Sequence, residues 1–411
     1  MHIKNNYKAT VAASFLGYIT QAIMLNFPPL LYIFFQSDFG LSLSQVSFLI
    51  TANIIVELVV DIVVSKIAYK IGYRPLILLA TILATLGLIS MFVLTSLFAN
   101  KFVALILSMM LCGAGGGIME VLISPIVEAC PTKNKSGMMS LLHSFYCWGQ
   151  AAVVLLSTIF FLIFGLENWM YAAIFWTIVP IICMLLFAKA PIYTLEEQGG
   201  KRESVLSLFK SKIFWVLVLM MICAGASELA MAQWASAFAE IAIGNSQLKW
   251  LTDLLGPCLF AICMGCARVF YAKMSEKIDL TKAIFISSII CICAYAITIL
   301  STLPVLSLIG CSLCGIGAGI MWPGSFSIAS AKMPGGGVLM FGFLALAGDF
   351  GCLIGPTLAG QASALFDDNL KVGFAVSIIF PLLLAIICAT MFIRSKRRKK
   401  SNIDEIKPSQ E

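Results

Sequence analysis

Charged residues are scarce in this chain. Only 11% of its 411 residues are Asp, Glu, Lys or Arg, whereas 60% are hydrophobic and the mean hydropathy is +0.99. Soluble domains carry about 25% charged residues. The composition therefore excludes a soluble domain and predicts an all-α protein embedded in lipid.

Residues for metal, redox or nucleotide chemistry are also few. There are two histidines, His2 and His143, and none of the 14 cysteines has a Cys/His spacing that suits zinc. Nearly all cysteines lie in apolar stretches, where cysteine acts as a small hydrophobic residue. A Walker lysine motif is missing, as are paired aspartates or a Ser/His set within these stretches. We therefore expect no enzyme activity, no cofactor, no metal site and no ATP-driven pumping.

Apolar sequence, in contrast, is abundant. Twelve stretches are long enough, at about 1.5 Å per residue, to cross a hydrocarbon core of about 30 Å. A polar linker at 189–211 separates two expected six-helix bundles at 1–188 and 212–393, and a basic tail follows at 394–411. The expected spans are residues 10–35, 44–68, 75–97, 102–130, 136–163, 168–188, 212–240, 251–274, 282–301, 304–331, 336–361 and 371–393.

A near-repeat supports the division into two halves. Leu111–Met119 reads LCGAGGGIM and, 202 positions later, Leu313–Met321 reads LCGIGAGIM, so seven of the nine residues coincide. Parallel repeats of transmembrane helices are typical of one large transporter architecture. The repeat therefore predicts two bundles of similar topology.

The basic residues predict the orientation in the membrane. Of the 27 Lys and Arg residues, 24 fall on the side that holds both termini, and only Lys101, Lys249 and Lys371 fall on the other. Because cytoplasmic loops carry the excess of Lys and Arg, both termini are predicted to be cytoplasmic. The segment RSKRRKK at 394–400 is expected to anchor at the anionic lipid surface, not to bind nucleic acid. The first apolar stretch continues past Leu30 without a cleavage site, so it is expected to be a span and not a signal peptide.

Ionisable residues inside a membrane are costly, so their positions point to function. The third, sixth, ninth and twelfth spans carry no charge in their interiors and are expected to face lipid. The other spans are expected to line a polar interior, with charged residues at Glu57, Asp61, Glu120, Glu128, Glu228, Arg268 and Asp349.

Polar residues also gather on single helix faces. One stripe comprises Asn53, Glu57 and Asp61, spaced i, i+4 and i+8. Another comprises residues 143, 146 and 150, spaced i, i+3 and i+7. Within lipid, such stripes must meet polar partners or water.

The chain carries GAGGGIMEVLISPIVEACP at 113–131, SLLHSFYCWGQ at 140–150 and MWPGSFSIA at 321–329. These three segments resemble the major facilitator superfamily and, within it, the fucose-permease-like sugar/proton symporters. GAGGGIMEVLISPIVEACP at 113–131 is similar to that family's glycine-rich helix in which an acidic residue precedes an Asn-Pro pair, with Ser124 in place of the Asn. SLLHSFYCWGQ at 140–150 is similar to a segment of the family's fifth span, and MWPGSFSIA at 321–329 matches an aromatic-Pro-x-x-Phe-Ser pattern. The resemblance covers about residues 15–390 and implies a two-bundle fold that functions as a monomer.

The resemblance also implies roles for individual residues. Glu120 takes the place of the family's proton-linked glutamate, and His143 and Tyr146 take cavity positions. Fucose symporters carry a coupling aspartate on the first span, where this chain has only Gln21 and Asn26 as strong polar candidates. This departure argues against fucose itself as the substrate.

Two further patterns of the superfamily are incomplete. The loop after its second span reads G-x-x-x-D-R-x-G-R, and here Lys70, Gly72 and Arg74 keep the basic part without the acid. The glycine signature of drug antiporters is absent from the fifth span, although GDFGCLIGPTLAG at 348–360 is similar. The first difference prevents any transfer of gating details, and the second weighs against multidrug transport.

We predict alternating access, in which the two halves rock about a midplane site while a buried carboxyl group exchanges a proton with substrate binding. Burial disfavours the charged form of such a group until water enters. Glu120 is the first candidate for the proton carrier, with a purely structural hydrogen bond to a neighbouring helix as the alternative. Glu57 and Asp349 are further candidates, and Asp349 could instead pair with Arg268.

Substrate contacts are expected from amides, aromatic rings and polar groups, since a ring suits the apolar face of a sugar and amides suit its hydroxyls. Asp61, Arg74 and Arg268 are expected to serve gating or structure, with the charged end of Arg268 reaching interfacial water. The candidate contacts are Gln21, Asn26, Asn53, His143, Tyr146, Gln150, Glu228, Gln233, Trp234 and Trp322.

The expected function is secondary active transport of a small polar solute, with a sugar favoured, coupled to protons or else to sodium. A drug or metabolite/proton antiporter of the same fold, working as an exporter, is the alternative. No organellar transit segment precedes the first span and the loops are short, so the expected location is a bacterial inner membrane.

Overall fold

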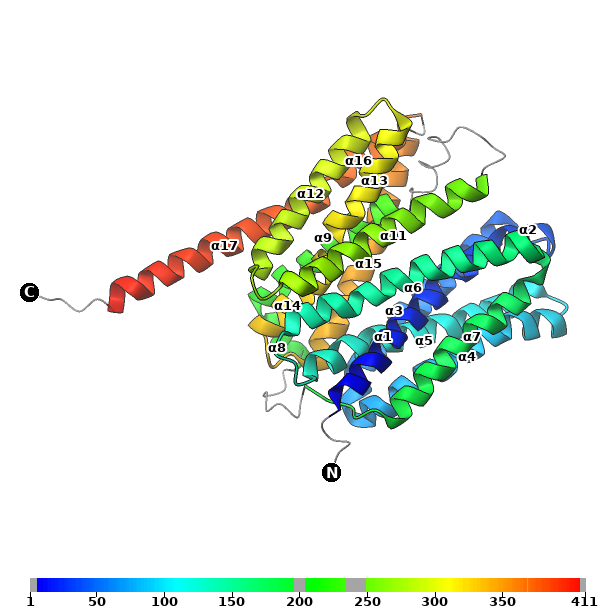
Figure 1. Cartoon of the computed structure of the whole chain (residues 1–411), viewed down its shortest axis with the longest axis horizontal. Coiled ribbons are helices and arrows are strands. Elements are labelled where there is room, and N and C mark those ends of the chain that lie inside the picture. Colours follow the sequence, from blue (N-terminus) through cyan, green and yellow to red (C-terminus); the bar gives the residue numbers. More distant parts are fainter. Residues whose placement is uncertain (1–5, 196–203, 234–248, 368, 407–411) are drawn as a thin grey trace, which may run out of the picture.

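The computed structural model describes residues 6–195, 204–233, 249–367 and 369–406, and these residues contain helices and no strand (Figure 1). Twelve helical segments are long and apolar enough to span a membrane, which confirms the predicted all-α fold with twelve spans. The helices are α1 (Tyr7–Asn26), η2 (Pro28–Leu31), α2 (Tyr32–Ser37), α3 (Leu43–Ile71), α4 (Tyr73–Leu97), α5 (Lys101–Ala129), α6 (Lys135–Phe164), η3 (Leu166–Asn168), α7 (Trp169–Lys189), α8 (Val205–Lys210), α9 (Lys212–Ala232), α11 (Lys249–Met274), α12 (Leu280–Leu300), α13 (Pro304–Ala318), α14 (Met321–Lys332), α15 (Gly337–Ala364), α16 (Leu370–Ser377) and α17 (Ile379–Ile406).

Side-chain caps fix where several spans begin. Ser42 and Gln45 form a reciprocal capping box at the start of α3, which satisfies two backbone N–H groups that a helix leaves free. The side chains of Asn100, Asn134 and Asp279 accept backbone N–H groups at the starts of α5, α6 and α12. Short polar turns therefore separate consecutive spans.

Prolines break two of the expected spans. Pro28 and Pro29 follow α1, so the first span ends in the short helix η2 and continues as α2. The tenth span is divided between α13 and α14, because Pro323 has no N–H to donate to the carbonyl group of Gly319, four residues earlier. The seventh span ends at Ala232 in α9, and the rest of its predicted range, from 234 to 240, lies outside the described residues.

Glycines bring neighbouring helices into backbone contact. A Cβ on Gly117 of α5 would lie 2.9 Å from Asp61 Oδ1 and 3.0 Å from the backbone oxygen of Glu57, both on α3. In the second half, Gly351 and Gly355 of α15 lie against the backbone of α9. Small residues permit this close approach in membranes, where burial from water does not drive helix association.

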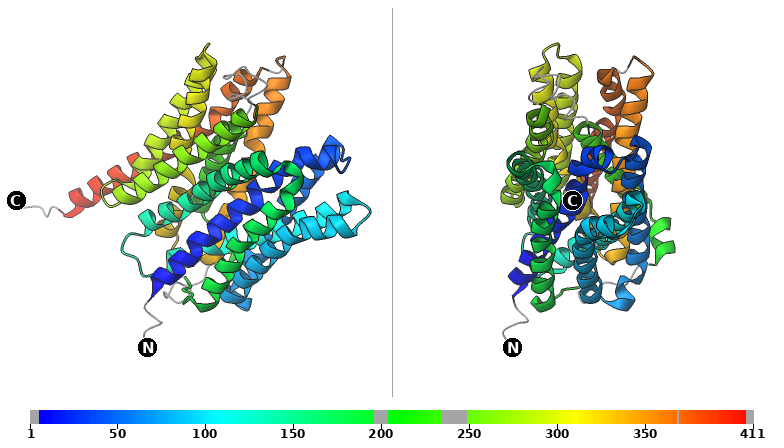
Figure 2. Two further views of the ribbon diagram at one scale, coloured as in Figure 1. Left: turned by 45° about the vertical axis from the view of Figure 1, so that its right-hand side comes forward. Right: turned by 90° about the vertical axis from the view of Figure 1, so that its right-hand side faces the viewer.

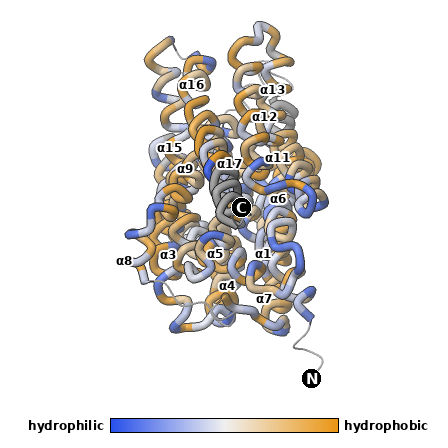
Figure 3. Tube along the Cα trace, turned by 90° about the vertical axis from the view of Figure 1, so that its left-hand side faces the viewer, coloured by the Kyte–Doolittle hydropathy of each residue, from blue (hydrophilic) through white to orange (hydrophobic). Residues whose placement is uncertain are grey.

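The four spans without interior charges carry large apolar side chains on their outer surfaces. Ile82 of α4, Ile178 of α7, Ile289 of α12 and Leu382 of α17 are all exposed. Hydrophobic residues dominate along the helices, while hydrophilic ones gather near helix ends (Figure 3). Comparably exposed apolar residues also lie on α3 and α6, such as Ile55 and Leu155, so exposure does not single out every third span, and the assignment of the lipid-facing spans stays a prediction.

Twelve spans place both ends of the chain on one side of the bundle, which we name the termini side; the opposite side is the far side. The first-half helices, from blue to green, lie beside the second-half helices, from yellow-green to red (Figure 2). Across this boundary α3 and α5 contact α15, and α6 contacts α11 and α14. On the termini side, Asn134 donates to Ser275 at 2.7 Å and Ser330 donates to Glu128 at 2.7 Å. Contacts between the halves therefore close the termini side.

Candidate functional site

Three polar side chains from three helices of the first half meet in the interior. The hydroxyl group of Tyr18 on α1 lies 2.7 Å from Ser124 Oγ on α5 and 3.2 Å from Nε2 of His143 on α6. Ser124 Oγ is also 3.2 Å from the same histidine nitrogen. All three side chains are buried, so the contacts satisfy polar groups that would otherwise be costly in the interior. His143, a predicted substrate contact, is thus a hydrogen-bonded interior histidine.

The predicted proton carrier has a partner on the first span. Gln21 Nε2 of α1 donates a short hydrogen bond to Glu120 Oε2 of α5. Gln21 is buried and its Oε1 atom meets no donor among the described residues, while Glu120 is half-buried. The pair joins an acid to an amide with hydrogen-bonding capacity to spare, which suits a polar solute.

The stripe on α3 packs against the glycine-rich face of α5. Asn53 Oδ1 lies beside Gly113, Glu57 Oε1 lies beside Gly116, and Asp61 Oδ1 lies beside Gly117. Asn53, Glu57 and Asp61 are all buried, and each of the three oxygen atoms lacks a donor among the described residues. The predicted stripe is therefore a buried row of one amide and two acids at the contact between α3 and α5.

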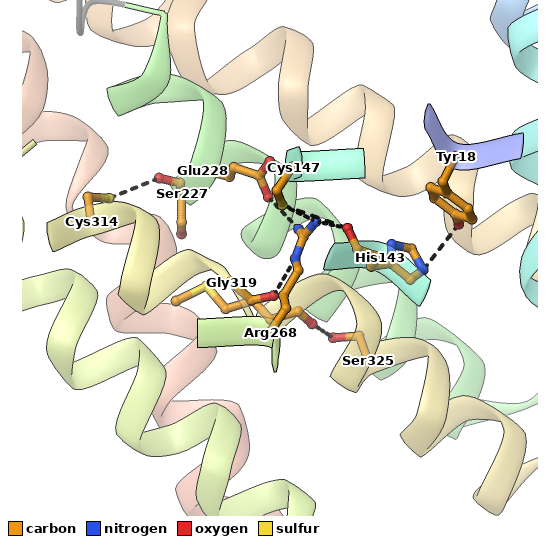
Figure 4. A network of polar contacts seen from close by, with 10 residues as sticks. Tyr18, His143, Cys147, Ser227, Glu228, Arg268, Cys314, Gly319 and Ser325 are labelled. Carbon is orange, nitrogen blue, oxygen red and sulfur yellow. Dashed lines mark hydrogen bonds and ion pairs between the residues drawn. The ribbon is translucent and has the colours of Figure 1, made fainter. Parts of the chain in front are cut away.

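Arg268 on α11 joins the two halves (Figure 4). Its Nη1 atom donates to the backbone oxygen of His143 at 2.8 Å and to Cys147 Sγ at 3.0 Å, both on α6. Its Nε atom donates at 2.8 Å to the oxygen of Gly319, the carbonyl group that Pro323 leaves without a helical donor.

The surroundings of Arg268 correct one expectation and decide another. Its side chain is only 3% exposed, so its charged end does not reach interfacial water as predicted; the hydrogen bonds in the interior hold it there. Its ionic partner is Glu228 of α9, with Nη2 and Oε2 3.6 Å apart. Asp349, the partner considered from the sequence, instead lies with Asp61.

The second half contributes an acid and an aromatic ring. The Trp322 indole of α14 packs against Gly348 of α15, where a Cβ would overlap the ring. It stands edge-on to Phe326, with ring centroids 6.3 Å apart, and Phe326 reaches His143 with centroids 5.8 Å apart. Asp349, next to Gly348, is half-buried and its carboxyl group lies within hydrogen-bonding range of Asp61. Aromatic and acidic groups of the second half thus reach the polar groups of the first.

Other predicted residues lie at the edges of this set. Asn26, the last residue of α1, donates to the Ala22 oxygen at 2.9 Å, and Tyr146 and Gln150 are half-buried on α6. Gln233 is exposed at the end of α9. Trp234 lies outside the described residues.

Arg74 has a structural position. Its guanidinium group donates to the backbone oxygens of Phe187, Ala188 and Ala190 at 2.7–2.8 Å. These carbonyl groups end α7, where a cation is favourable and where helical donors are missing. Arg74 therefore ties the start of α4 to the end of α7 within the first half.

A metal site and an apolar groove are the other kinds of site that the described residues could form. Within the described ranges, no group of three or more His, Cys, Asp or Glu residues is arranged to hold a metal ion. An apolar groove of about 340 Å³ lies between α11, α12 and α13, where Phe270 and Ile286 are exposed. The groove contains none of the predicted site residues.

Sequence reasoning missed Tyr18, Cys147 and Gly319. Tyr18 precedes Gln21 by three residues and so shares its helix face, which is a usable signal. The roles of Cys147 and Gly319 depend on where Arg268 lies in space, which no local pattern encodes.

A twelve-span fold with buried acids and amides between two bundles is that of a membrane transporter. The chain belongs to the Major Facilitator Superfamily, because the sequence model of that family matches residues 10–356 and 259–410. No curated protein matches the chain in sequence. The resemblance noted from the motifs is therefore confirmed at the level of family.

Solved structures share the fold at low sequence identity. The Escherichia coli fucose:proton symporter FucP is 15% identical, with a TM-score of 0.76 over 94% of this chain and 99% of that one. The proton:xylose symporter XylE, bound to 6-bromo-6-deoxy-D-glucose, is 11% identical, with a TM-score of 0.80 over 95% and 96%. The human organic anion transporter MFSD10 is 16% identical, with a TM-score of 0.70 over 93% and 99%.

Proposed function

We propose that this protein is a proton-coupled secondary transporter that moves a small polar solute, with a sugar favoured, by alternating access. The observation that carries the proposal is the Gln21–Glu120 hydrogen bond, which joins a buried amide of α1 to a half-buried acid of α5. Glu120 serves as the proton carrier, because a buried carboxyl group holds its proton until solute or water replaces its surroundings.

The polar groups around this pair suit a hydroxylated solute. Gln21, beside the half-buried Glu120, keeps an oxygen without a donor among the described residues, and a sugar hydroxyl can donate to such an atom. Trp322, which is also half-buried, supplies aromatic surface for the apolar face of a sugar ring. The likeness to structures of FucP and XylE, a fucose:proton and a proton:xylose symporter, supports the same class.

The alternative is an antiporter that exports a drug or metabolite. An organic anion is disfavoured by charge, since the described interior set, apart from Glu128 near the termini side, comprises five acids and one arginine that is already paired. An anion brought into this set would lose its hydration without gaining a free cation as a partner. The five acids are Glu57, Asp61, Glu120, Glu228 and Asp349.

We place the protein in a bacterial inner membrane with both termini in the cytoplasm, functioning as a monomer. The excess of Lys and Arg on the termini side supports this orientation. In that orientation the contacts between the halves close the cytoplasmic side, so the structure corresponds to a state before solute is released inward.

The test is uptake of a panel of labelled monosaccharides into sealed vesicles that hold the purified protein, with and without an inward proton gradient. We expect gradient-driven accumulation of at least one sugar. Glu120→Gln should abolish accumulation while keeping exchange of solute down its own gradient, because the amide cannot carry a proton. Glu276→Gln, at an exposed position of the loop after α11, is the matched control.

Full proton-driven accumulation by Glu120→Gln would refute the assignment of the carrier. If no sugar accumulates in vesicles of verified orientation, the substrate is a different metabolite or the protein is an exporter. Growth resistance upon overexpression would then favour export.

A further inference from the structure

The two halves bring a pair of acidic side chains together at their contact. Asp61 lies on α3 of the first half and Asp349 lies on α15 of the second, and their carboxyl groups are within hydrogen-bonding range. Asp61 is completely buried, with an exposed fraction of 0%. Neither oxygen of Asp61, nor Oδ2 of Asp349, meets an N–H or O–H donor among the described residues. Among the residues that the structure describes, no donor joins these carboxyl groups, so a hydrogen bond between them requires a proton of their own.

Two further acids flank this pair. Glu57 precedes Asp61 by one turn on α3, and Glu120 follows Gly116 and Gly117, the glycines beside Glu57 and Asp61, by one turn on α5. Arg268, a buried cation of the interior, is already paired with Glu228 of α9. Two adjacent carboxylates cannot both stay ionised when they are buried without a cation, as in acid pairs that share one proton. Gly117, which lies directly against Asp61, and the Trp322 ring beside Gly348 supply no charge.

The pair also lies where the halves must part. Ser65, one turn from Asp61 toward the termini side, packs directly against Gly342 of α15. Because α3 and α15 run in opposite directions, opening the termini side separates Ser65 from Gly342 and then Asp61 from Asp349. Water would then reach each carboxyl group alone, and both could ionise.

We propose that Asp61 and Asp349 form a second proton-binding site, distinct from Glu120, which holds a proton while α3 and α15 are in contact and releases it when the termini side opens. The proposal rests on the proposed proton-coupled transport and adds a second acid site to it. Proton release at this site favours separation of the halves, so the site links proton occupancy to the conformational change.

The first test needs no solute. Infrared spectroscopy of the purified protein detects protonated carboxyl groups by their stretching band as the pH is varied. We expect one band that persists at neutral pH, remains in Glu120→Gln, and disappears in both Asp61→Asn and Asp349→Asn. Asp38→Asn, at an exposed acid after α2, is the matched control and should leave this band unchanged. If the band that remains in Glu120→Gln also survived both Asp variants, the proposal would be overturned.

The second test follows the contact itself by hydrogen–deuterium exchange. After correction for the base-catalysed rise of intrinsic amide exchange, peptides from the termini-side ends of α3 and α15 should lose protection in the wild type as the pH rises, because the pair loses its proton. The Asp61→Asn variant should exchange several-fold more slowly than the wild type at the same high pH, because its amide donates to the Asp349 carboxylate without a proton. Equal exchange in the two proteins would contradict the role in closure.

Sodium provides the competing explanation. If sodium chloride, but not choline chloride, slows exchange and no carboxyl band is found, the pair binds a cation and the proton assignment is wrong. These readings are independent of transport. Missing sugar uptake with a carboxyl band present would refute the proposed substrate alone, whereas proton-driven uptake without the band would refute the second site alone.

Discussion

Replacing Arg268 with methionine should destabilise the protein strongly. The change leaves the half-buried Glu228 carboxylate without its cation and removes two hydrogen bonds of 2.8 Å, to the backbone oxygens of His143 and Gly319. Hydrogen bonds that involve a charged group contribute about 1.5–3 kcal/mol each. Breaking a buried ion pair by removal of one partner costs about 3–5 kcal/mol. Because these losses overlap, we expect a decrease in the free energy of unfolding of about 3–5 kcal/mol.

Unfolding in mixed detergent micelles, followed by tryptophan fluorescence, measures this decrease. Lys273→Met is the matched control, since Lys273 is exposed on the same helix, α11, and should change stability by less than about 0.5 kcal/mol. Adding Glu228→Gln to the Arg268→Met variant should recover part of the loss, because the unpaired charge is then removed. If Arg268→Met matched the Lys273 control, the interior network around Arg268 would contribute nothing and the reasoning would be refuted.

Two further changes test packing and capping. Gly117→Ala should lower the free energy of unfolding by about 1–3 kcal/mol, because its Cβ would lie 2.9 Å from Asp61 Oδ1. Gly116→Ala should have a smaller effect, because its Cβ would lie 3.2 Å from Glu57 Oε1. Thermal unfolding ranks the two variants, and the reverse order would contradict the packing. Arg74→Gln should lower the free energy of unfolding by about 1–2 kcal/mol, because it removes the hydrogen bonds that cap the end of α7. The uptake rate per folded molecule should not change. Slower uptake at unchanged stability would instead identify Arg74 as part of a gate.

Hydropathy predicted the number of spans and most of their limits, because lipid requires long apolar helices whatever their partners. It also located the interior acids, since an isolated charge such as Glu120 or Asp349 is conspicuous within an apolar run. These features depend on one element at a time, so the linear order of residues was sufficient.

Contacts between elements could not be predicted in this way. The position of Arg268 near the end of its span suggested a water-facing charge, yet its partners lie on α6, α9 and the α13–α14 break. Pro323 predicts a broken helix. The sequence around it does not reveal that Arg268 donates to the carbonyl group of Gly319 that the break leaves free. The meeting of Asp61 with Asp349 requires the two halves to be docked, which depends on packing over the whole boundary.

The break between α13 and α14 has no equivalent in α5, the helix that carries the first copy of the repeat. At the offset of 202 residues, Trp322 corresponds to Glu120 and Pro323 corresponds to Val121, so the first copy of the repeat continues unbroken through α5. Equivalent places on a duplicated backbone therefore present an acid joined to an amide in one half and an indole resting on glycine in the other. The scaffold is close to symmetric and its lining is not. A molecule held between the halves would meet a polar wall and an aromatic wall, so its two orientations would differ in energy.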